Sequence, residues 1–184
     1  NGKSFVDSTK LAVCHNRRIN SHKTFKGLAQ RGQTSMGWFF GFKLHIVTDD
    51  CGDIVDFSLS TGNVHDGNKN IIDKIVDKVH GFLVGDKAYI GLFKHLYAKG
   101  IKLLHRLRSN MKNKLLSMDE KILLQRRGSI IETAVGILKD YLSLEHTRHR
   151  SPINFLCHVF SCLISYAFYK ADSNNRKIFP ILSI

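Results

Sequence analysis

The sequence has no CxxC pair, no signal peptide and no internal repeat. The four cysteines, Cys14, Cys51, Cys157 and Cys162, follow no regular spacing, so we expect reduced thiols and no disulfide framework. Cys157 and Cys162 could be imagined as zinc ligands together with His158. They lie in an apolar stretch where buried thiols are common, and the spacing of known zinc ligands is missing. A zinc site built on these thiols is therefore disfavoured.

No apolar run in the sequence reaches the length of a membrane-spanning helix. The most apolar segment, residues 155–168, has 14 residues and contains His158, Ser161 and Ser165, whereas a bilayer span needs about 20 apolar residues. The segment predicts a buried core helix and no membrane partner. Pro152 precedes it at a position where proline is favoured, the first turn of a helix.

Acidic residues are few. The chain has 28 Lys and Arg against 15 Asp and Glu, a formal net charge of +13 and a pI of about 9.8. This surplus favours a polyanionic partner. A merely basic surface or a membrane surface fits the charge equally well, because net charge bears on partners and association and says little about fold.

The size and composition predict one globular domain over residues 1–184. A chain of 184 residues that is 43% hydrophobic can build an ordinary buried core. The chain opens at Asn1 and enters a strand-like run almost at once, so we expect that N-terminal sequence precedes this segment in the natural protein.

Periodicity and turn residues predict a mixed α/β architecture. The expected strands cover residues 4–9, 38–48, 54–60, 82–85 and 101–107, and the expected helices cover 66–79, 92–97, 122–141 and the segment after Pro152. Residues 16–34 are polar and basic and predict a long exposed loop, and residues 108–121 predict a second loop or poorly packed insertion.

Three carboxylates stand where chemistry is expected. Asp7 and Asp86 each follow an apolar run that predicts a strand, and ligands collect at strand ends near a change of direction. Glu132 lies on a predicted helix, and Lys139 shares its face because seven residues make about two turns. Taken singly, each carboxylate is as easily a solvated charge or a helix cap. Together they can hold hard divalent cations, which suits phosphodiester chemistry.

Six short segments occur in a specific order. They are FVDS at 5–8, GWFFGFKLH at 37–45, GNVHD at 62–66, LVGDKAY at 83–89, IIET at 130–133 and HTRHRS at 146–151. In this order the chain resembles the DDE transposases of bacterial insertion sequences over nearly its whole length.

The resemblance implies a ribonuclease H-like fold, a mixed sheet flanked by helices. It implies Asp7, Asp86 and Glu132 as the catalytic triad and as ligands of Mg²⁺ or Mn²⁺, with two ions expected. The implied activity is metal-dependent DNA cleavage and strand transfer during insertion-sequence transposition. The implied partners are double-stranded DNA, both element ends and target, and further copies of the chain in a homo-oligomer. A cytoplasmic, nucleoid-associated bacterial location and an upstream DNA-recognition region are also implied.

One departure concerns the tyrosine, arginine, glutamate and lysine signature of some relatives. Glu132 and Lys139 fit it, but Gln125 and Gly128 occupy the tyrosine and arginine positions. Arg127 is the candidate to supply the guanidinium instead.

Basic residues flank the three carboxylates, and phosphate contacts of this kind fix position without reading bases. A charge run is usually a solvated face, so the groove is a hypothesis. The predicted DNA contacts are Arg17, Arg18, Lys87, Tyr89, Arg126, Arg127, Lys139, Arg148 and Arg150.

Other residues have a plainer interpretation. Asp66 is expected to cap the helix that follows it, and the role of His65 stays open. Alternation on the 38–48 strand predicts burial for Phe40 and Phe42, although aromatic side chains of the same segment could stack on an unpaired base.

Two other functions remain open at this stage. One is a nuclease of the same fold that only hydrolyses DNA. The other is an inactive or truncated DNA-binding remnant of an insertion sequence, against which the retention of all three carboxylates argues.

Overall fold

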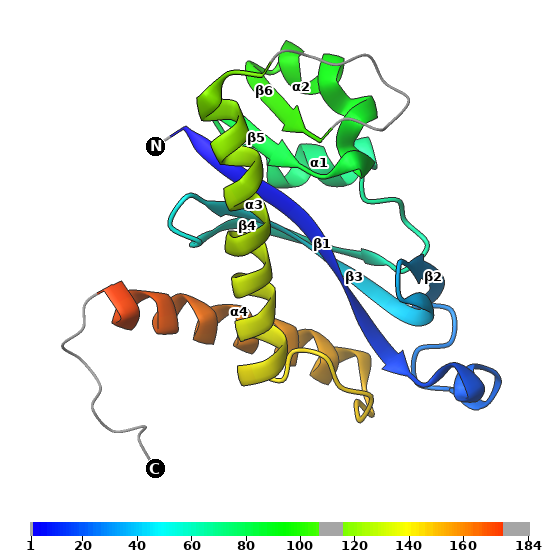
Figure 1. Cartoon of the computed structure of the whole chain (residues 1–184). Coiled ribbons are helices and arrows are strands. Elements are labelled where there is room, and N and C mark those ends of the chain that lie inside the picture. The colour runs from blue at the N-terminus through cyan, green and yellow to red at the C-terminus, as the bar shows by residue number, and fades with distance from the viewer. Residues whose placement is uncertain (1, 107–115, 175–184) are drawn as a thin grey trace.

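A computed structural model of the chain describes residues 2–106 and 116–174, and Figure 1 shows how its elements are arranged. The strands are β1 (Lys3–Cys14), β2 (Gln30–Thr34), β3 (Gly37–Asp49), β4 (Ile54–Thr61), β5 (Gly81–Gly85) and β6 (Ile101–His105). The α-helices are α1 (Lys69–Ile75), α2 (Phe93–Ala98), α3 (Met118–Gly136) and α4 (Pro152–Asn174). Two 3₁₀ helices, η1 (Asn16–Ser21) and η2 (Lys87–Leu92), and a π-helical turn, η3 (Ile137–Tyr141), complete the order.

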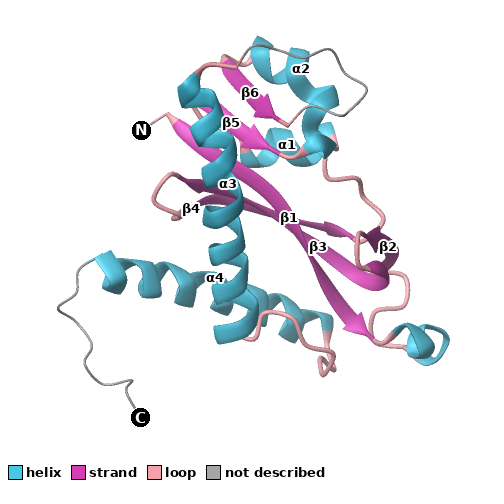
Figure 2. Cartoon of the chain, in the orientation of Figure 1, coloured by secondary structure: helices cyan, strands magenta, loops and turns pink. Residues whose placement is uncertain are grey.

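The six strands form one mixed sheet in the order β2-β3-β1-β5-β6, with β4 also paired to β3. Strand β1 runs antiparallel to β3 and parallel to β5, and β5 runs parallel to β6. Figure 2 shows helices on both faces of this curled sheet. The architecture confirms the predicted α/β class and is consistent with a ribonuclease H-like fold.

Alternation along the strands divides the core between the two faces. Phe5 and Val84 point to one face and pack with Ile131 of α3. Val6 points to the other face and packs with Ile72 of α1. Because successive side chains of a strand point to opposite faces, the side chains at odd-numbered positions near Phe5 point towards α3. Asp7 is one of these positions.

The first strand is longer than predicted, and Asp7 lies in its middle rather than at its end. Strand β1 continues to Cys14, because Thr9, Leu11 and Val13 keep every second side chain buried. Its partner β3 stays paired along this whole length. What does end near Asp7 is the parallel pairing with β5.

The predicted loop over residues 16–34 is wrong in two places. It contains η1 and the edge strand β2, whose Gln30 pairs with Gly41 of β3. The polar residues of β2 gave no hydrophobic alternation. The strand fits because Gly32 has no side chain, and a Cβ there would lie 2.1 Å from the carbonyl oxygen of Gly62.

The other helix boundaries also shift. Helix α1 begins at Lys69 and ends at Ile75, shorter than the predicted 66–79. Part of the predicted loop 108–121 is helical, because α3 begins at Met118 behind a capping box of Ser117 and Glu120. Residues 107–115 of that prediction lie outside the described residues. Gly128 does not interrupt α3, which continues to Gly136 and then into η3.

Helix α4 begins at Pro152 as predicted, but only one side of it is buried. The segment Pro152–Ser173 is long and apolar enough to cross a membrane by length and composition alone, and 28% of it is buried inside the structure. The buried side carries Phe155, Val159, Cys162, Leu163 and Tyr166. The exposed side carries Ile153, Leu156, Phe160, Ile164, Phe168 and Tyr169. The predicted core helix is therefore correct for one face.

Two hydrogen bonds attach α4 to the turn between β3 and β4. The hydroxyl of Tyr166 donates to the carbonyl oxygen of Gly52 at 2.6 Å, within the core. The ammonium of Lys170 donates to the carbonyl oxygen of Cys51, also at 2.6 Å. These bonds fix the far end of α4 against the sheet.

A layer of buried polar side chains lies between the sheet and the loop before α1. Ser8 donates to Asp66 at 2.6 Å, and Lys43 donates to the same carboxylate oxygen at 2.9 Å. Beside them, His45 and Ser60 share a hydrogen bond of 2.8 Å. Burial alone would raise the pKa of Asp66, but the bonds from Ser8 and Lys43 and the charge of Lys43 outweigh it and lower that pKa.

The expected capping role of Asp66 is wrong. Asn68 caps α1, and its side-chain oxygen accepts from the amide of Asn70 at 3.0 Å. Asp66 is drawn instead to the buried ammonium of Lys43, because a buried charge needs an opposite partner.

Removal of the Tyr166 hydroxyl should weaken the fold without changing its shape. Tyr166→Phe leaves the buried carbonyl of Gly52 without its donor, which we expect to lower the free energy of unfolding by about 1 to 3 kcal/mol. Urea denaturation measures the change. Tyr169→Phe, on the exposed side of α4, is the control and should be close to neutral. Equal effects of the two variants would contradict the assignment.

The buried ring of His45 should make stability depend on pH. Burial lowers its pKa from 6.5 to about 4, so the folded state binds this proton less tightly than the unfolded chain. The stabilisation is fully present above pH 6.5 and is lost as the pH falls towards 4, by at most about 3 kcal/mol. His45→Gln should reduce the slope of unfolding free energy against pH in that window. The reduction should correspond to the uptake of up to one proton on unfolding. The exposed His80→Gln should keep the wild-type slope, and an unchanged slope in His45→Gln would exclude this role.

Candidate active site with three carboxylates

The parallel pairing of β1 with β5 brings the two aspartates together. The last paired residues are Phe5 and Val84, and Asp7 and Asp86 each stand two positions further along. The carboxylate of Asp86 accepts from the amide of Ala88 at 2.7 Å and so caps η2. Asp7 on β1 and Asp86 just after the end of β5 therefore stand side by side, at the level where the parallel ladder stops.

Helix α3 adds the third carboxylate. Ile131 and Ala134 bury one side of α3 against the sheet, which leaves Glu132 exposed beside the strand ends. Glu132 lines two adjoining hollows, one of about 310 Å³ with Asp7 and another of about 300 Å³ with Asp86. The structure thus brings together the three carboxylates that the sequence singled out, from β1, from the end of β5 and from α3.

The pKa of the Asp7 carboxyl is raised. Burial raises its pKa, and the negative charges of Asp86 and Asp66 add to the rise. The guanidinium of Arg127 and the amide of Ser8 act in the opposite direction. Because Asp7 is partly desolvated and lies near the carboxylates of Asp86 and Asp66, a positive charge beside it stabilises its ionised form.

Arg127 supplies positive charge at this place. Its Nη2 lies 2.9 Å from Oδ2 of Asp7, and it donates to the carbonyl oxygen of Val6 at 3.4 Å. Its Nε is buried without a partner among the described residues. Arg127 also lines the hollow of Asp86 and Glu132. The guanidinium of Arg127 therefore contacts Asp7, although the arginine in the signature of some relatives stands one residue later, where this chain has Gly128.

The donor set around these hollows fits a hard divalent cation, since every acidic ligand offers oxygen. In the described part of the chain, the oxygen atoms of Asp7, Asp86 and Glu132 do not all approach within 4.8 Å of one another. Arg127 stands at Asp7 where a cation would bind. Binding of such a cation would compete with the ion pair of Arg127 and Asp7.

Tyr89 lies beneath the site. Its side chain is fully buried, and a Cβ on Gly85 would lie 2.8 Å from its ring. Burial raises its pKa well above the usual value, and the charges of Asp7, Asp66 and Asp86 add to the rise. The hydroxyl has no partner among the described residues. The ring is therefore covered by protein, so this side chain is not accessible for the contact with DNA that the sequence predicted.

Lys139 lines the hollow of Asp7 and Glu132, but its charge is already paired. Its Nζ lies 2.7 Å from Glu145 Oε2, and Glu145 Oε1 accepts from the amide of Ala12 at 3.1 Å. Glu145 thus links the end of β1, the turn η3 and the loop before α4.

The other predicted DNA contacts are spread over several elements. Lys87 is exposed and lines the hollow of Asp86. Arg126 is exposed on α3 and donates to the carbonyl oxygen of Asp50 at 3.2 Å. Arg17, Arg18, Arg148 and Arg150 are exposed on η1 and on the loop before α4. They do not line the hollows of the carboxylates.

Sequence reasoning missed three participants. Arg106 lines the hollow of Asp86, and Lys43 and Ser8 hold Asp66 next to the aspartate of β1. Three of the ordered segments carried a signal. GWFFGFKLH and GNVHD each contribute one partner of the ion pair between Lys43 and Asp66, and FVDS contains Ser8.

Comparison with known proteins agrees with this geometry. The family model described as transposase DDE domain matches residues 1–152. No curated protein and no solved structure gives a significant match. The matched region includes all three carboxylates and far more than half of the 184 residues. The chain therefore belongs to the transposase DDE domain family.

Proposed function

We propose that this protein cleaves DNA strands and joins them to a new site during insertion-sequence transposition, in a reaction that depends on divalent metal ions. The observation that carries the proposal is the meeting of Asp7, Asp86 and Glu132 from three elements within the matched family region. An all-oxygen set of this kind suits Mg²⁺ or Mn²⁺.

In this proposal Asp7, Asp86 and Glu132 hold two such ions. The ions would supply activation of the attacking oxygen and stabilisation of the leaving oxygen in an in-line displacement. The residues of the chain prepare this site. The layer of Ser8, Asp66 and Lys43 orients the segment of β1 that carries Asp7, because a bonded side chain beneath a strand restricts its movement.

Arg127 has a separate part. It neutralises Asp7 when no cation is bound, and it is free to turn towards a phosphate when a cation takes over this charge. Its planar guanidinium suits bidentate contact with phosphate oxygens. Lys87 and Arg106 border the same hollow and offer further positive charge to the backbone of the scissile strand.

The exposed arginines position the DNA on the protein. We propose that Arg17, Arg18, Arg126, Arg148 and Arg150 contact phosphates of double-stranded DNA, element end or target, away from the reacting atoms. Lys139 takes part in the same surface through its place beside Glu132. We further propose that copies of the chain assemble on DNA. A nuclease of the same fold would release cut ends and form no joined product, and an inactive remnant would bind without cutting, so the product decides among the three.

Loss of one carboxylate should abolish the chemistry. Asp7→Asn, Asp86→Asn and Glu132→Gln each remove a charged ligand, and we expect each to lower strand cleavage in Mg²⁺ by about 100-fold or more, the scale for loss of one transition-state stabiliser. Cleavage and joining of a labelled element end measure the effect.

The control is Asp77→Asn, at an exposed position outside the hollows. It should cleave as the wild type does. Circular dichroism should show the same fold in all variants. Near-normal cleavage by any of the three carboxylate variants would refute the assignment of that residue.

DNA binding should depend strongly on salt, and Arg148 and Arg150 should account for part of the dependence. Each phosphate contact lowers the slope of log K against log salt by about 0.9 on duplex DNA. Arg148→Ala with Arg150→Ala should therefore flatten the slope by up to about 2. The double variant of the exposed Lys74 and Lys94 is the charge-matched control, and equal slopes in both doubles would remove the two arginines from the DNA surface.

A further inference from the structure

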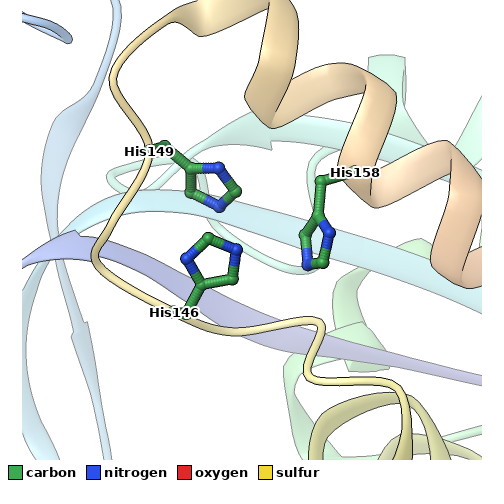
Figure 3. Close-up of side chains that lie close together, drawn as sticks. All are labelled: His146, His149 and His158. Atoms are coloured by element: carbon green, nitrogen blue, oxygen red, sulfur yellow. The ribbon is translucent and has the colours of Figure 1, made fainter.

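Three histidines meet where the loop after η3 joins α4. His146 and His149 come from the segment HTRHRS in this loop, and His158 comes from α4. Figure 3 shows the three rings facing one another between the loop and the helix. None of these side chains takes part in the carboxylate site, so their grouping needs an explanation of its own.

The distances are those of a ligand cluster. One nitrogen from each ring can be chosen so that all three lie within 4.8 Å of one another. The rings of His146 and His149 are stacked with centroids 3.8 Å apart, and the ring of His158 stands 4.6 Å from that of His146. Two nitrogens bonded to one tetrahedral zinc ion lie about 3.4 Å apart, because zinc-nitrogen bonds are about 2.0 to 2.1 Å long. The three rings are therefore close enough to bind one ion after a small movement.

The cluster has an unsatisfied nitrogen at its centre. His149 is only 8% exposed, and its Nε2 has no hydrogen-bond partner among the described residues. A buried polar atom without a partner is costly. Glu145, the acid beside the cluster, is engaged by Lys139 and by the amide of Ala12. Glu145 therefore offers the three imidazoles no free carboxylate.

Two contacts between the rings and backbone groups compete only weakly with a metal. The amide of Arg148 donates to His146 Nδ1 at 3.2 Å, and His158 Nε2 lies 3.0 Å from the carbonyl oxygen of Ser143. Both contacts are at the exposed surface, so water replaces either backbone group when a ring nitrogen takes a metal.

We propose that His146, His149 and His158 form a transition-metal site, best suited to Zn²⁺, with a water molecule at the fourth position. Three imidazoles and one open position satisfy the tetrahedral preference of zinc. The site shares His158 with the thiol set that the sequence disfavoured but uses neither thiol. Cys157 is exposed and stands outside the cluster, and the Sγ of Cys162, which lies 3.6 Å from His158 Nε2, donates to the carbonyl oxygen of Leu142.

The bound ion would hold the loop to α4. That loop carries Arg148 and Arg150 and, through Glu145, contacts Lys139 and the end of β1. A metal bridge between loop and helix therefore orders a segment next to the carboxylate hollow. The inference does not require the proposed DNA chemistry, because metal binding is measured by itself.

The test is direct titration of the intact chain at neutral pH in excess Mg²⁺, which fills oxygen ligands and leaves imidazole to Zn²⁺ or Co²⁺. We expect one Zn²⁺ per chain, a rise in the thermal unfolding midpoint, and visible Co²⁺ absorption typical of four-coordinate nitrogen and oxygen ligands. His149→Gln and His158→Gln should each weaken Zn²⁺ affinity by at least about 10-fold, since even indirect partners of a metal contribute that much. Cys157→Ser, on the same helix, should bind as the wild type does.

Wild-type protein that takes up no stoichiometric Zn²⁺ would overturn the proposal, and so would histidine variants that bind with unchanged affinity. If the variants fail to fold, X-ray absorption of the Zn²⁺-loaded wild type decides, because a first shell with three imidazole nitrogens supports the site and a shell of oxygen alone refutes it. Loss of DNA cleavage in Asp7→Asn with Zn²⁺ uptake intact would separate the two sites.

Discussion

The parallel pairing of β1 with β5 is the contact on which the candidate active site depends. It places Asp7 beside Asp86 although 78 other residues separate them in the chain. The ladder stops at Phe5 and Val84, where β5 gives way to η2 and β1 continues alongside β3. Because β1 and β5 diverge here, a space opens at the surface of the sheet. Glu132 of α3 lies at the edge of this space. A one-residue slip of the register would turn Asp7 to the opposite face, away from α3.

Buried charge is the second constraint. Asp7 lies on β1 and Asp66 lies in the loop before α1, where it contacts Ser8 on the other face of β1. Each has its own cation, Arg127 for Asp7 and Lys43 for Asp66. The two pairs differ in purpose. Lys43 is almost fully buried and is bonded to Val64 and Asp66, so it is part of the framework. Arg127 borders a hollow and pairs with a carboxylate of the candidate site.

The loop before α4 contacts the region of the site through Glu145. Glu145 joins the amide of Ala12 on β1 to Lys139 on η3, and the histidine cluster follows directly after it in the chain. The π-helical turn η3 carries Lys139 towards the hollow of Glu132, and π-turns of this kind often occur at functional sites. The loop that carries Arg148 and Arg150 is therefore connected to α3, the helix that carries Glu132.

The sequence by itself determined the features that repeat locally. Alternation located β3, turn residues marked the start of β4, and a short apolar run located β5. Helical spacing located α3, Pro152 marked the start of α4, and the ordered segments named the three carboxylates that the fold brings together. Tertiary structure decided the rest. The polar strand β2 exists because Gly32 fits against Gly62, β1 runs past Asp7 because β3 pairs with it to Cys14, and Asp66 leaves the cap of α1 for Lys43. The meeting of His158 with His146 and His149 likewise depends on how a loop folds back on α4. Each of these outcomes rests on a partner distant in sequence, and local periodicity carries no information about such a partner.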